Sequence, residues 1–558
     1  MNWKGEEMKE VKKVRLTGSE AIARAMKECG VEYFFYVMGG MMIYPQIENA
    51  GVKTVLCRNE KSATNMADGY ARVTKKPTAC YSQHGAAAAI LASMMYEPMY
   101  AHSPVIALTG SYPTTKKDSW SYQECYEMKY FEQTCKFNVD VTDVSRLAEY
   151  VRTAIQVAVS GCPGPTHLSM HTDMADSTAE MPEIYGNKIF STIPPFRPRP
   201  EPERVVEAAK LLASAERPVM VCGSGVSLSG ACDEVKGLAE LLMIPVATNP
   251  NGKGCFPEEH PLSLGVMGTY GRSIANDFVR GADLVFLVAT RAGRMQMEEF
   301  TSPVPGTSKI IQLDIDPLVI GRNYKPDVAL VGDAKATLQE LLSVLKVMIA
   351  KPEPKGERLK ELAKAIKEYE SEVKQLTSDA LPIKPQRLMK EISGFLSPGD
   401  IVVSDTGNIL NWTSRLLKLK ERVLFLPAGG TLGSSFSLAI GASFAAEKDQ
   451  RIVHLTGDGG LGYNLMDLET ARRYNDQRAP MVTVVNNNSV LGSEMFPLTE
   501  LDYAKIAEAF GCYGIRVERP GEITDALQLA VHSGKPAIVD VVTDKTERAP
   551  LRVNYLRG

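Results

Sequence analysis

The sequence contains no closely spaced pair of cysteines. Its ten cysteines are scattered along 558 residues, without a C-x-x-C motif. A zinc site or a redox dithiol needs neighbouring thiolates, and a disulfide framework suits a small secreted chain better than one of this length. We therefore expect free thiols, most of them buried, and no metal site built from soft ligands.

The sequence also lacks a basic excess and a long apolar run. Lysine and arginine number 63 against 66 aspartates and glutamates, a formal net charge of -3, so no surplus is available to neutralise a nucleic-acid backbone. The longest apolar-leaning run, Gly85 to Met95, is shorter than the roughly 20 residues that span a bilayer. Met1 to Arg15 is rich in Lys and Glu and has no apolar stretch typical of a secretory signal. We expect a cytoplasmic protein that binds neither nucleic acid nor membrane.

Three segments with alternating strand and helix patterns make up the chain. At roughly 150 residues per domain, this length suggests three or four domains. The first segment opens with a capping-box pattern, Thr17-Gly-Ser-Glu20, and a proline-rich stretch, Ile193 to Pro202, separates it from the second. A charged helical stretch, Lys351 to Gln375, leads into the third. We predict an α/β fold of three doubly wound parallel-sheet domains, residues 1–190, 203–350 and 382–558, with a linker helix at 351–381.

A glycine-rich turn in the third segment carries the most specific chemical pattern. Arg451 to Thr456 is predicted to be a strand, and Gly457-Asp-Gly-Gly460 follows it at once. Tyr463 to Tyr474 is predicted to be a helix, and Pro480 to Val485 a second strand that ends in Asn486-Asn-Asn488. Backbone N–H groups of such a turn can approach a phosphate closely. The aspartate and asparagine oxygens are hard donors that suit Mg²⁺ shared with a diphosphate.

This pair of motifs resembles the signature of thiamin diphosphate (ThDP) enzymes, G-D-G followed further along the chain by N-N. The family often reads N-N-x-x-x-G, which Asn487-Asn488-Ser-Val-Leu-Gly492 fits. The resemblance implies Mg²⁺ bound by Asp458, the Asn488 side chain and the Val490 carbonyl, with Asn487 as the alternative to Asn488. It also implies cofactor contacts at Gly457, Asp458, Gly459, Gly460 and Asn488.

The first segment carries a matching element of the same family. Arg58-Asn-Glu60-Lys-Ser-Ala63 and then Met66-Ala-Asp-Gly-Tyr-Ala-Arg72 resemble the family's R-x-E-x-x-A and M-A-D-G-Y-A-R stretches. In these enzymes the glutamate protonates N1′ of the aminopyrimidine ring and so promotes deprotonation of thiazolium C2. The resemblance assigns that role to Glu60. It also implies that Glu60 acts across a subunit interface, so we expect a homodimer at minimum and, as in many members, a homotetramer.

Two further loops match the same family. Ala428-Gly-Gly-Thr-Leu432-Gly433 resembles the G-x-M-G loop that holds the pyrimidine. Gly430 would offer its carbonyl, and Leu432 its N–H group and the wedge beneath the bent cofactor. Ser404-Asp-Thr-Gly-Asn408 matches a second diphosphate-contacting loop, which adds Gly407 and Asn408. The resemblance covers nearly the whole chain in the order pyrimidine-binding, central and diphosphate-binding domain, the layout of acetolactate synthases, benzoylformate decarboxylases, oxalyl-CoA decarboxylases and 2-hydroxyacyl-CoA lyases.

Several markers of the acetolactate synthases are changed. They usually carry S-G-P-G where this chain has Ser82-Gln-His84-Gly85. The His84 imidazole could exchange protons with the substrate, or it could pack against the cofactor loop. Tyr122-Gln123-Glu124 resembles the F-Q-E element, so Gln123 either orients the substrate carbonyl or lies at a solvent-facing helix start. The flavin-contacting R-F-D-D-R is replaced by Thr290-Arg-Ala-Gly-Arg294, which makes FAD doubtful.

These observations lead to one preferred function and two alternatives. We predict a ThDP- and Mg²⁺-dependent enzyme that cleaves and forms C–C bonds next to a carbonyl, a 2-oxo acid decarboxylase/carboligase resembling acetolactate synthase. The absence of a Q-W-Q-like tryptophan in Gly492 to Pro497, together with Arg58-Asn-Glu60, makes a 2-hydroxyacyl-CoA lyase or oxalyl-CoA decarboxylase-like enzyme, with an acyl-CoA or ketol substrate, the alternative. A catalytically silent regulatory homologue is disfavoured, because Glu60 and Asp458 are both present.

Overall fold

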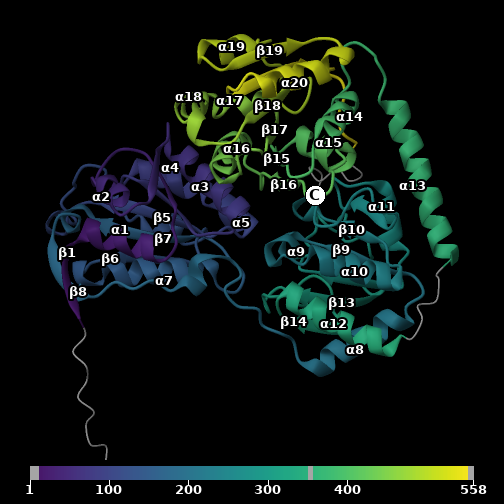
Figure 1. Cartoon of the computed structure of the whole chain (residues 1–558), viewed down its shortest axis with the longest axis horizontal. Coiled ribbons are helices and arrows are strands. Elements are labelled where there is room, and N and C mark those ends of the chain that lie inside the picture. Colours follow the sequence, from purple (N-terminus) through teal and green to yellow (C-terminus); the bar gives the residue numbers. More distant parts are fainter. Residues whose placement is uncertain (1–11, 350–355, 551–558) are drawn as a thin grey trace, which may run out of the picture. The chain divides into compact units, whose positions relative to one another are not determined.

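The chain divides into two compact units, Met1–Pro195 and Phe196–Gly558 (Figure 1). The computed structural model describes residues 12–349 and 356–550. The predictions made for residues 1–11 and for the first residues of the linker helix, 351–355, lie outside the described residues. Within the described part, no helix combines the length and the apolar character needed to cross a membrane.

The first unit is built on a six-stranded parallel sheet. Its strands run in the order β3-β2-β4-β5-β7-β6 and are β2 (Tyr33–Tyr36), β3 (Lys53–Leu56), β4 (Thr78–Ser82), β5 (Val105–Ser111), β6 (Phe137–Val141) and β7 (Thr166–His171). A separate antiparallel pair joins β1 (Lys13–Thr17) to β8 (Thr178–Pro182). The helices are α1 (Gly18–Glu28), α2 (Tyr44–Asn49), α3 (Glu60–Thr74), α4 (Ala86–Met94), α5 (Tyr96–Ala101), α6 (Met128–Phe131) and α7 (Leu147–Val159).

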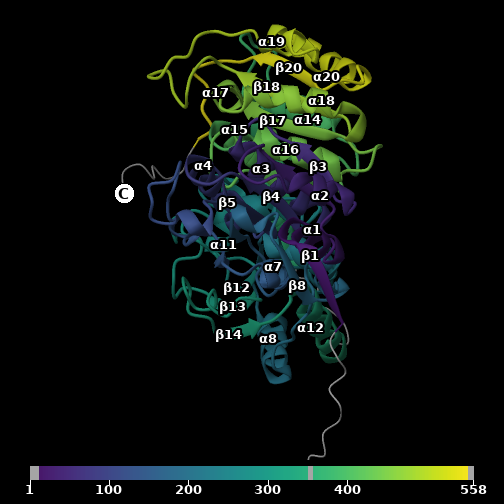
Figure 2. The ribbon, with the colours of Figure 1, turned by 90° about the vertical axis from the view of Figure 1, so that its left-hand side faces the viewer.

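Helices cover both faces of this sheet (Figure 2), which is why its central strands β4, β5 and β7 are buried along their whole length. Helices α1 and α7 share one buried cluster with Phe34, Leu108 and Leu168. Helix α3 packs on β2, β4 and β5. Because neighbouring side chains of a strand point to opposite faces, Thr109 and His167 lie on the face opposite Leu108 and Leu168.

The helix predicted after Thr17 is confirmed. The Thr17 side chain accepts a hydrogen bond from Glu20 N, and the Glu20 carboxylate accepts one from Thr17 N at 2.9 Å. Helix α1 ends at Glu28, with Cys29 as its C-cap. The local capping pattern was sufficient here because both partners of each bond lie within four residues.

The second unit contains two more six-stranded parallel sheets. The first has the order β11-β10-β9-β12-β13-β14 and consists of β9 (Pro218–Cys222), β10 (Val246–Thr248), β11 (Ser263–Val266), β12 (Leu284–Val288), β13 (Lys309–Asp314) and β14 (Val328–Val331). Its helices are α8 (Pro202–Ser214), α9 (Ser224–Ser229), α10 (Cys232–Leu242), α11 (Ser273–Arg280) and α12 (Ala334–Met348). Helix α8 begins at Pro202, because proline is well suited to the first helical position.

The second of these sheets carries the predicted diphosphate motifs. Its order is β16-β15-β17-β18-β20-β19, with β15 (Ile401–Ser404), β16 (Leu424–Pro427), β17 (Ile452–Gly457), β18 (Met481–Asn487), β19 (Tyr513–Val517) and β20 (Ala537–Val542). The helices are α14 (Pro385–Phe395), α15 (Asn408–Leu416), α16 (Ser434–Ala445), α17 (Asp458–Gly462), α18 (Leu468–Arg473), α19 (Tyr503–Ala509) and α20 (Ile523–His532). The strand order reverses between β15 and β17, the place where parallel α/β sheets bind ligands.

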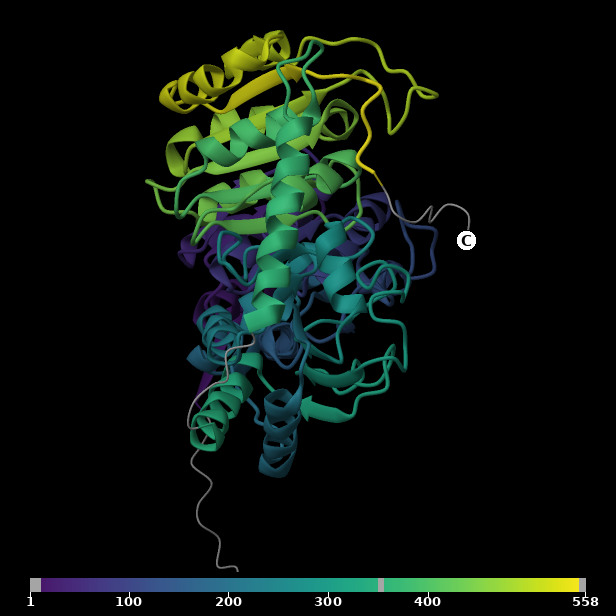
Figure 3. The ribbon, with the colours of Figure 1, turned by 90° about the vertical axis from the view of Figure 1, so that its right-hand side faces the viewer.

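A long helix connects the two sheets of the second unit. Helix α13 (Gly356–Leu376) contacts α11 on one side and α14 on the other, and runs along the outside of the unit (Figure 3). It corresponds to the described part of the predicted linker helix. The three sheets lie within residues 33–171, 218–331 and 401–542, which confirms the predicted fold class of three parallel-sheet α/β domains. The boundaries at 190, 203, 351 and 382 remain our proposal.

One predicted helix differs from the structure. Instead of one helix over Tyr463 to Tyr474, the chain forms α17 from Asp458, a 3-10 turn at Leu465–Asp467 and then α18. Helix α17 begins at Asp458, with Gly457 as its N-cap and without a side-chain capping hydrogen bond. The turn at Leu465–Asp467 then interrupts the helical periodicity that the sequence pattern indicated.

Candidate active site

The carboxylate of Asp458 ties the turn after β17 to the loop after β18. Asp458 is 4% exposed, and its Oδ1 accepts a hydrogen bond from Gly459 N at 2.8 Å. Its Oδ2 accepts one from Ser489 N at 2.6 Å. Burial raises the pKa of Asp458 to about 6, against the opposing effect of these two N–H donors. A buried anionic oxygen is therefore held where the two loops meet.

The three consecutive asparagines have different surroundings. Asn487 Nδ2 donates to the Leu501 carbonyl and to Asp540 Oδ1, each at 2.9 Å, which commits this side chain to the core. Asn488 follows the end of β18, and its Oδ1 accepts a long hydrogen bond of 3.3 Å from Val490 N. Among the described residues, buried Asn486 Oδ1 has no hydrogen-bond partner. Asn487 and Asn488, which the sequence motif left as alternative metal ligands, therefore differ clearly in their hydrogen bonds.

Asp405 is a central residue of this region that sequence reasoning missed. It is fully buried, and its carboxylate accepts hydrogen bonds from Thr406 N at 2.9 Å, Gly433 N at 3.0 Å and the Thr456 hydroxyl at 2.9 Å. A Cβ on Gly460 would lie 2.1 Å from Asp405 Oδ2. Burial raises the pKa of Asp405 to about 6. Its signal in the sequence was its position directly after strand β15, in the loop Ser404 to Asn408, where only Gly407 and Asn408 were assigned a cofactor contact.

The loops after β15 and β16 carry the remaining predicted residues of this half-site. Gly407 has φ +81° and precedes α15, and Gly430 has φ +148°; both backbone conformations favour glycine. Asn408 Nδ2 donates to the Gly492 carbonyl at 3.2 Å. Leu432 is half-buried beside Gly433. Because carboxyl ends of parallel strands share one edge, the structure brings these loops together with the Asp458 turn.

Open space lies beside three of the glycines on this edge. A Cβ added to Gly407, Gly430 or Gly457 would meet no atom within 4 Å. A backbone without a side chain, next to open space, can be approached closely by an anionic group. By contrast, Gly460 is closed off by Asp405 and therefore has a structural reason to be glycine.

In the first unit, Glu60 is the first residue of α3. Asn59 caps the helix, its side chain accepting a hydrogen bond from Ser62 N at 2.9 Å. The half-buried Glu60 carboxylate has no hydrogen-bond or ion-pair partner within residues 12–349 and 356–550. Further along α3, Arg72 Nε donates to Asp68 Oδ1 at 3.0 Å, so this part of the matching stretch has a structural role.

His84 and Gln123 lie close together in the first unit. His84 Nε2 is 2.9 Å from the Tyr122 carbonyl oxygen, and Gln123 Nε2 donates to the Tyr122 hydroxyl at 3.2 Å. Gln123 is in a loop with φ +58° and not at a helix start. His84 Nδ1 and Gln123 Oε1 are buried and have no hydrogen-bond partner among the described residues. Two polar atoms are thus available to a ligand in this place.

The two arginines of Thr290 to Arg294, the stretch that replaces the flavin-contacting motif, have contacts within the protein. Arg294 Nε forms an ion pair with Glu299 on the surface of the second unit. The Arg291 carbonyl accepts a hydrogen bond from Asn323 Nδ2 at 3.0 Å. Neither contact points to a flavin, and FAD remains doubtful.

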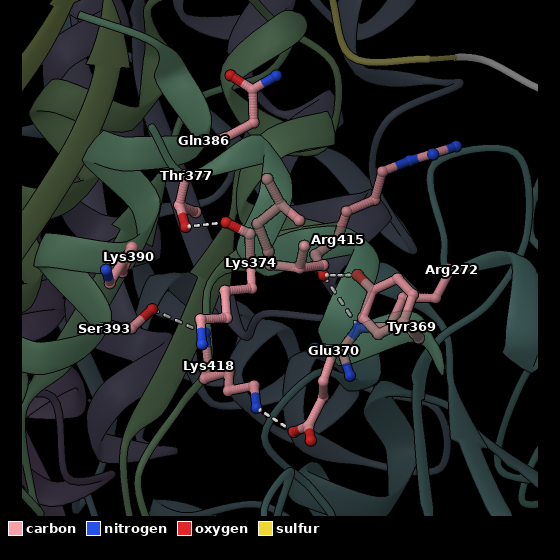
Figure 4. A pocket seen from close by; sticks show the side chains of 12 residues that line it. Arg272, Tyr369, Glu370, Lys374, Thr377, Gln386, Lys390, Ser393, Arg415 and Lys418 are labelled. Atoms are coloured by element: carbon pink, nitrogen blue, oxygen red, sulfur yellow. Dashed lines mark hydrogen bonds and ion pairs between the residues drawn. The ribbon is translucent and has the colours of Figure 1, made fainter. Parts of the chain in front are cut away.

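A cavity in the second unit is lined by none of the predicted site residues and is therefore not part of the candidate active site. It has a volume of about 360 Å³ and lies beside α13, α14 and α15 (Figure 4). Its walls contain positively and negatively charged side chains. Lys418 pairs with Glu370 at 2.7 Å, and Arg272 Nε donates a hydrogen bond to the Arg415 carbonyl at 2.9 Å.

Comparisons with known proteins agree with this arrangement. Residues 16–136 match the thiamine pyrophosphate enzyme N-terminal TPP binding domain, residues 205–341 its central domain and residues 405–541 its C-terminal TPP binding domain. A probable acetolactate synthase large subunit of Methanocaldococcus jannaschii is 34% identical over 96% of this chain and 93% of its own length. The probable large subunit of Methanococcus aeolicus is 31% identical, over 95% and 92%, and an acetolactate synthase of Mycobacterium bovis is 28% identical, over 95% and 88%. The chain therefore belongs to the thiamine pyrophosphate enzyme family and resembles its acetolactate synthase large subunits.

Proposed function

We propose that this protein is a ThDP- and Mg²⁺-dependent enzyme that removes CO2 from a 2-oxo acid and joins the remaining fragment to a second carbonyl compound, as acetolactate synthases do. The observation that carries the proposal is the full-length similarity to acetolactate synthase large subunits, 34% over 96% of the chain. The meeting of the Asp458 turn with the Asn488 loop supports it, because a ThDP enzyme needs a hard-donor metal site there.

The residues of the second unit fit the diphosphate and its metal. Asp458, Asn488 and the Val490 carbonyl supply the hard oxygen ligands that Mg²⁺ prefers. Asn487 suits this role less well, since Asp540 and the Leu501 carbonyl already hold its amide. Gly407 and Gly457, with open space beside them, would receive the phosphate oxygens. When bound, ThDP supplies an electron sink for the carbon next to the broken bond.

Glu60 is proposed to hold and return a proton at N1′ of the aminopyrimidine ring. Its carboxylate has no partner within the described part of the chain, so a ring nitrogen can take up its hydrogen-bonding capacity. Helix α3 is held in place by its Asn59 cap, which positions Glu60.

His84 and Gln123 are proposed to contact the substrate. The buried Nδ1 of His84 can exchange a proton with an oxygen of the substrate, and the unpartnered Oε1 of Gln123 can accept a hydrogen bond from a hydroxyl group. Both side chains contact the same residue, because His84 Nε2 is bound at the Tyr122 carbonyl and Gln123 Nε2 at the Tyr122 hydroxyl, so one small substrate can reach both side chains.

We propose that the chain binds further copies of itself. The minimum assembly is a homodimer, and the complete assembly is a homotetramer. Both units expose large apolar side chains, which monomers usually bury. In the first unit these include Met38, Met42, Trp120 and Tyr122, and in the second Tyr463, Met466, Met495 and Phe496. Burial of such side chains against a second copy would also exclude water from the reaction.

The alternative is a 2-hydroxyacyl-CoA lyase or oxalyl-CoA decarboxylase-like enzyme. The observation that favours it is the loop from Gly492 to Pro497, which lacks the tryptophan of acetolactate synthases. Met495 and Phe496 in this loop are 81% and 60% exposed, so they could cover a longer substrate.

Product analysis distinguishes the two. Purified protein supplied with Mg²⁺ and ThDP is given pyruvate, CO2 is measured, and products are identified by mass spectrometry. Release of CO2 together with acetolactate or another ketol supports the carboligase. No turnover of pyruvate or other 2-oxo acids, with ThDP shown to be bound, would contradict it and favour acyl-CoA or ketol substrates that are cleaved without loss of CO2.

A further inference from the structure

The carboxyl group of Glu127 in the first unit has no part in the steps above. Glu127 is 3% exposed, and its Oε1 accepts a hydrogen bond from Gly85 N at 3.1 Å. Its Oε2 lies 3.1 Å from the Thr109 hydroxyl and 3.2 Å from the Ser169 hydroxyl. These contacts place a buried ionisable group directly behind the loop that carries His84.

The hydrogens of this network can be assigned, beginning at Asn138. Asn138 Nδ2 donates to the Met128 carbonyl at 2.6 Å, so Asn138 Oδ1 is the atom that faces His167 Nδ1 at 2.8 Å. An amide oxygen only accepts, and His167 Nδ1 must therefore carry a hydrogen. The His167 ring is fully buried and stacked on Phe131, with centroids 3.6 Å apart. Burial lowers the pKa of His167 to about 3, so the ring is neutral and Nε2 accepts.

The contact of Thr109 with His167 determines which hydrogen bond Thr109 can form with Glu127. Its hydroxyl lies 2.9 Å from His167 Nε2 and 3.1 Å from Glu127 Oε2, and it has one hydrogen for the two contacts. Because His167 Nε2 has no hydrogen to give, the Thr109 hydrogen points to it. The Thr109 oxygen then faces Glu127 Oε2 as an acceptor, and this contact is a hydrogen bond when Glu127 carries a proton.

The protonated state satisfies every polar atom of the network. Glu127 Oε2 donates to Thr109 and accepts from Ser169, while Oε1 accepts from Gly85 N. Burial raises the pKa of Glu127 to about 7, which agrees with this assignment made from geometry.

The groups around Glu127 provide no compensating positive charge. The described titratable groups that interact with it are Cys125 on its own loop, Tyr130 on α6, Tyr81 on β4, Asp140 on β6 and, through Thr109, neutral His167 on β7. His171 on β7 lies 3.5 Å from Asp140 and pairs with that carboxylate. An ionised Glu127 would therefore be an unpaired charge in the core.

Gly85 connects this carboxyl group to the candidate active site. Gly85 directly follows His84, and a Cβ on it would lie 2.5 Å from Gln123 Cβ, so its backbone is held between Gln123 and Glu127. We propose that Glu127 is a positioning residue that keeps its proton in the working enzyme and, through Gly85 N, holds His84 and Gln123 in place for the reaction. This inference deepens the proposed function and rests on it.

Ionisation of Glu127 breaks the network. Carboxylate Oε2 can only accept, so Thr109 must either turn its hydrogen to Glu127 and leave His167 Nε2 without a donor, or face Glu127 with two acceptors in contact. The folded pKa, about 7, lies above the ordinary value. The stability and the positioning that the proton provides are therefore complete below the ordinary pKa and are lost as the pH rises through about 7.

Infrared spectroscopy of the whole protein tests the protonation. Below the pKa of about 7, the difference spectrum between wild type and Glu127→Gln should contain the C=O stretch of a protonated carboxyl group, and this band should disappear above that pKa. The exposed Glu132 supplies the control, because Glu132→Gln should leave the band unchanged. If Glu127→Gln does not fold, Thr109→Val should shift the same band and Thr109→Ser should not. Absence of a Glu127 band in wild type would overturn the proposal.

The pH profile of kcat/KM tests the positioning. Glutamine keeps an oxygen for Gly85 N and an N–H donor for Thr109, so Glu127→Gln should stay active and lose the fall that wild type shows near the pKa of about 7. A folded Glu127→Gln protein whose kcat/KM is lower by about tenfold or more below that pKa, or which keeps the same fall, would overturn the positioning role. If no substrate is turned over, the proposed function fails while the infrared test still decides on the proton.

Discussion

At the scale of single residues, Asn487 and Asn488 differ in where their hydrogen bonds go. The Asn487 amide binds the Leu501 carbonyl and Asp540, whereas Asn488 has one long contact within its own loop. Adjacent residues of the same type are therefore expected to respond differently to the same substitution.

Alanine at Asn488 is expected to weaken retention of Mg²⁺ and ThDP by about tenfold or more, because a direct ligand is lost. Its free energy of unfolding should change little. Alanine at Asn487 should instead lower the free energy of unfolding by about 1–3 kcal/mol, since the buried Asp540 carboxylate and the Leu501 carbonyl lose their donor. Cofactor titration and urea denaturation of both variants provide the measurement. Loss of cofactor in Asn487→Ala with normal retention in Asn488→Ala would reverse our assignment.

At the scale of secondary-structure elements, the sequence indicated the three sheets, because each strand and helix has a local period or cap. Thr17 and Glu20 bind each other across three residues and could be recognised without the fold. Asp405 could not be recognised from the sequence, since its hydrogen-bond donors Gly433 and Thr456 lie 28 and 51 residues further along the chain. Glu127 was missed for the same reason. Contacts that distant appear in a sequence only as an isolated acidic residue near a strand or a loop.

The turn at the start of α17 allows a direct test of the Asp405 contact. Gly460→Ala should lower the free energy of unfolding by about 1–3 kcal/mol, because the added Cβ would lie 2.1 Å from Asp405 Oδ2. Gly462 in the same helix is the matched control, with no atom within 4 Å of an added Cβ. Its alanine variant should stay within about 0.5 kcal/mol of wild type. Equal stability of the two variants in urea denaturation would show that the Asp405 contact is absent.

At the scale of the whole molecule, the residue proposed to act at N1′ and the residue proposed to bind the metal belong to different compact units. Glu60 lies in Met1–Pro195 and Asp458 in Phe196–Gly558. If Glu60 acts on the cofactor of a second copy, two inactive variants should complement each other. The proposed dimer therefore makes a prediction that a site within one chain does not make.

Mixing the subunits of two inactive variants measures this complementation. Glu60→Gln and Asp458→Asn should each be inactive alone, and their mixed dimers should hold one intact site, formed by Glu60 of one copy and Asp458 of the other. Random mixing in equal amounts should restore about a quarter of wild-type activity, because half of the dimers are mixed and each has one of two sites. No recovery after unfolding and refolding the two together, with wild type recovering, would argue against a shared site.

The central claim, that Glu60 activates ThDP bound to this protein, is tested most directly by hydrogen exchange at thiazolium C2. Protein loaded with ThDP and Mg²⁺ is transferred to D2O, quenched after set times and analysed by proton NMR, with no substrate present. The account predicts rapid exchange in wild type and exchange slower by about 100-fold or more in Glu60→Gln, with the same amount of ThDP bound. Equal exchange rates in the two proteins would contradict it.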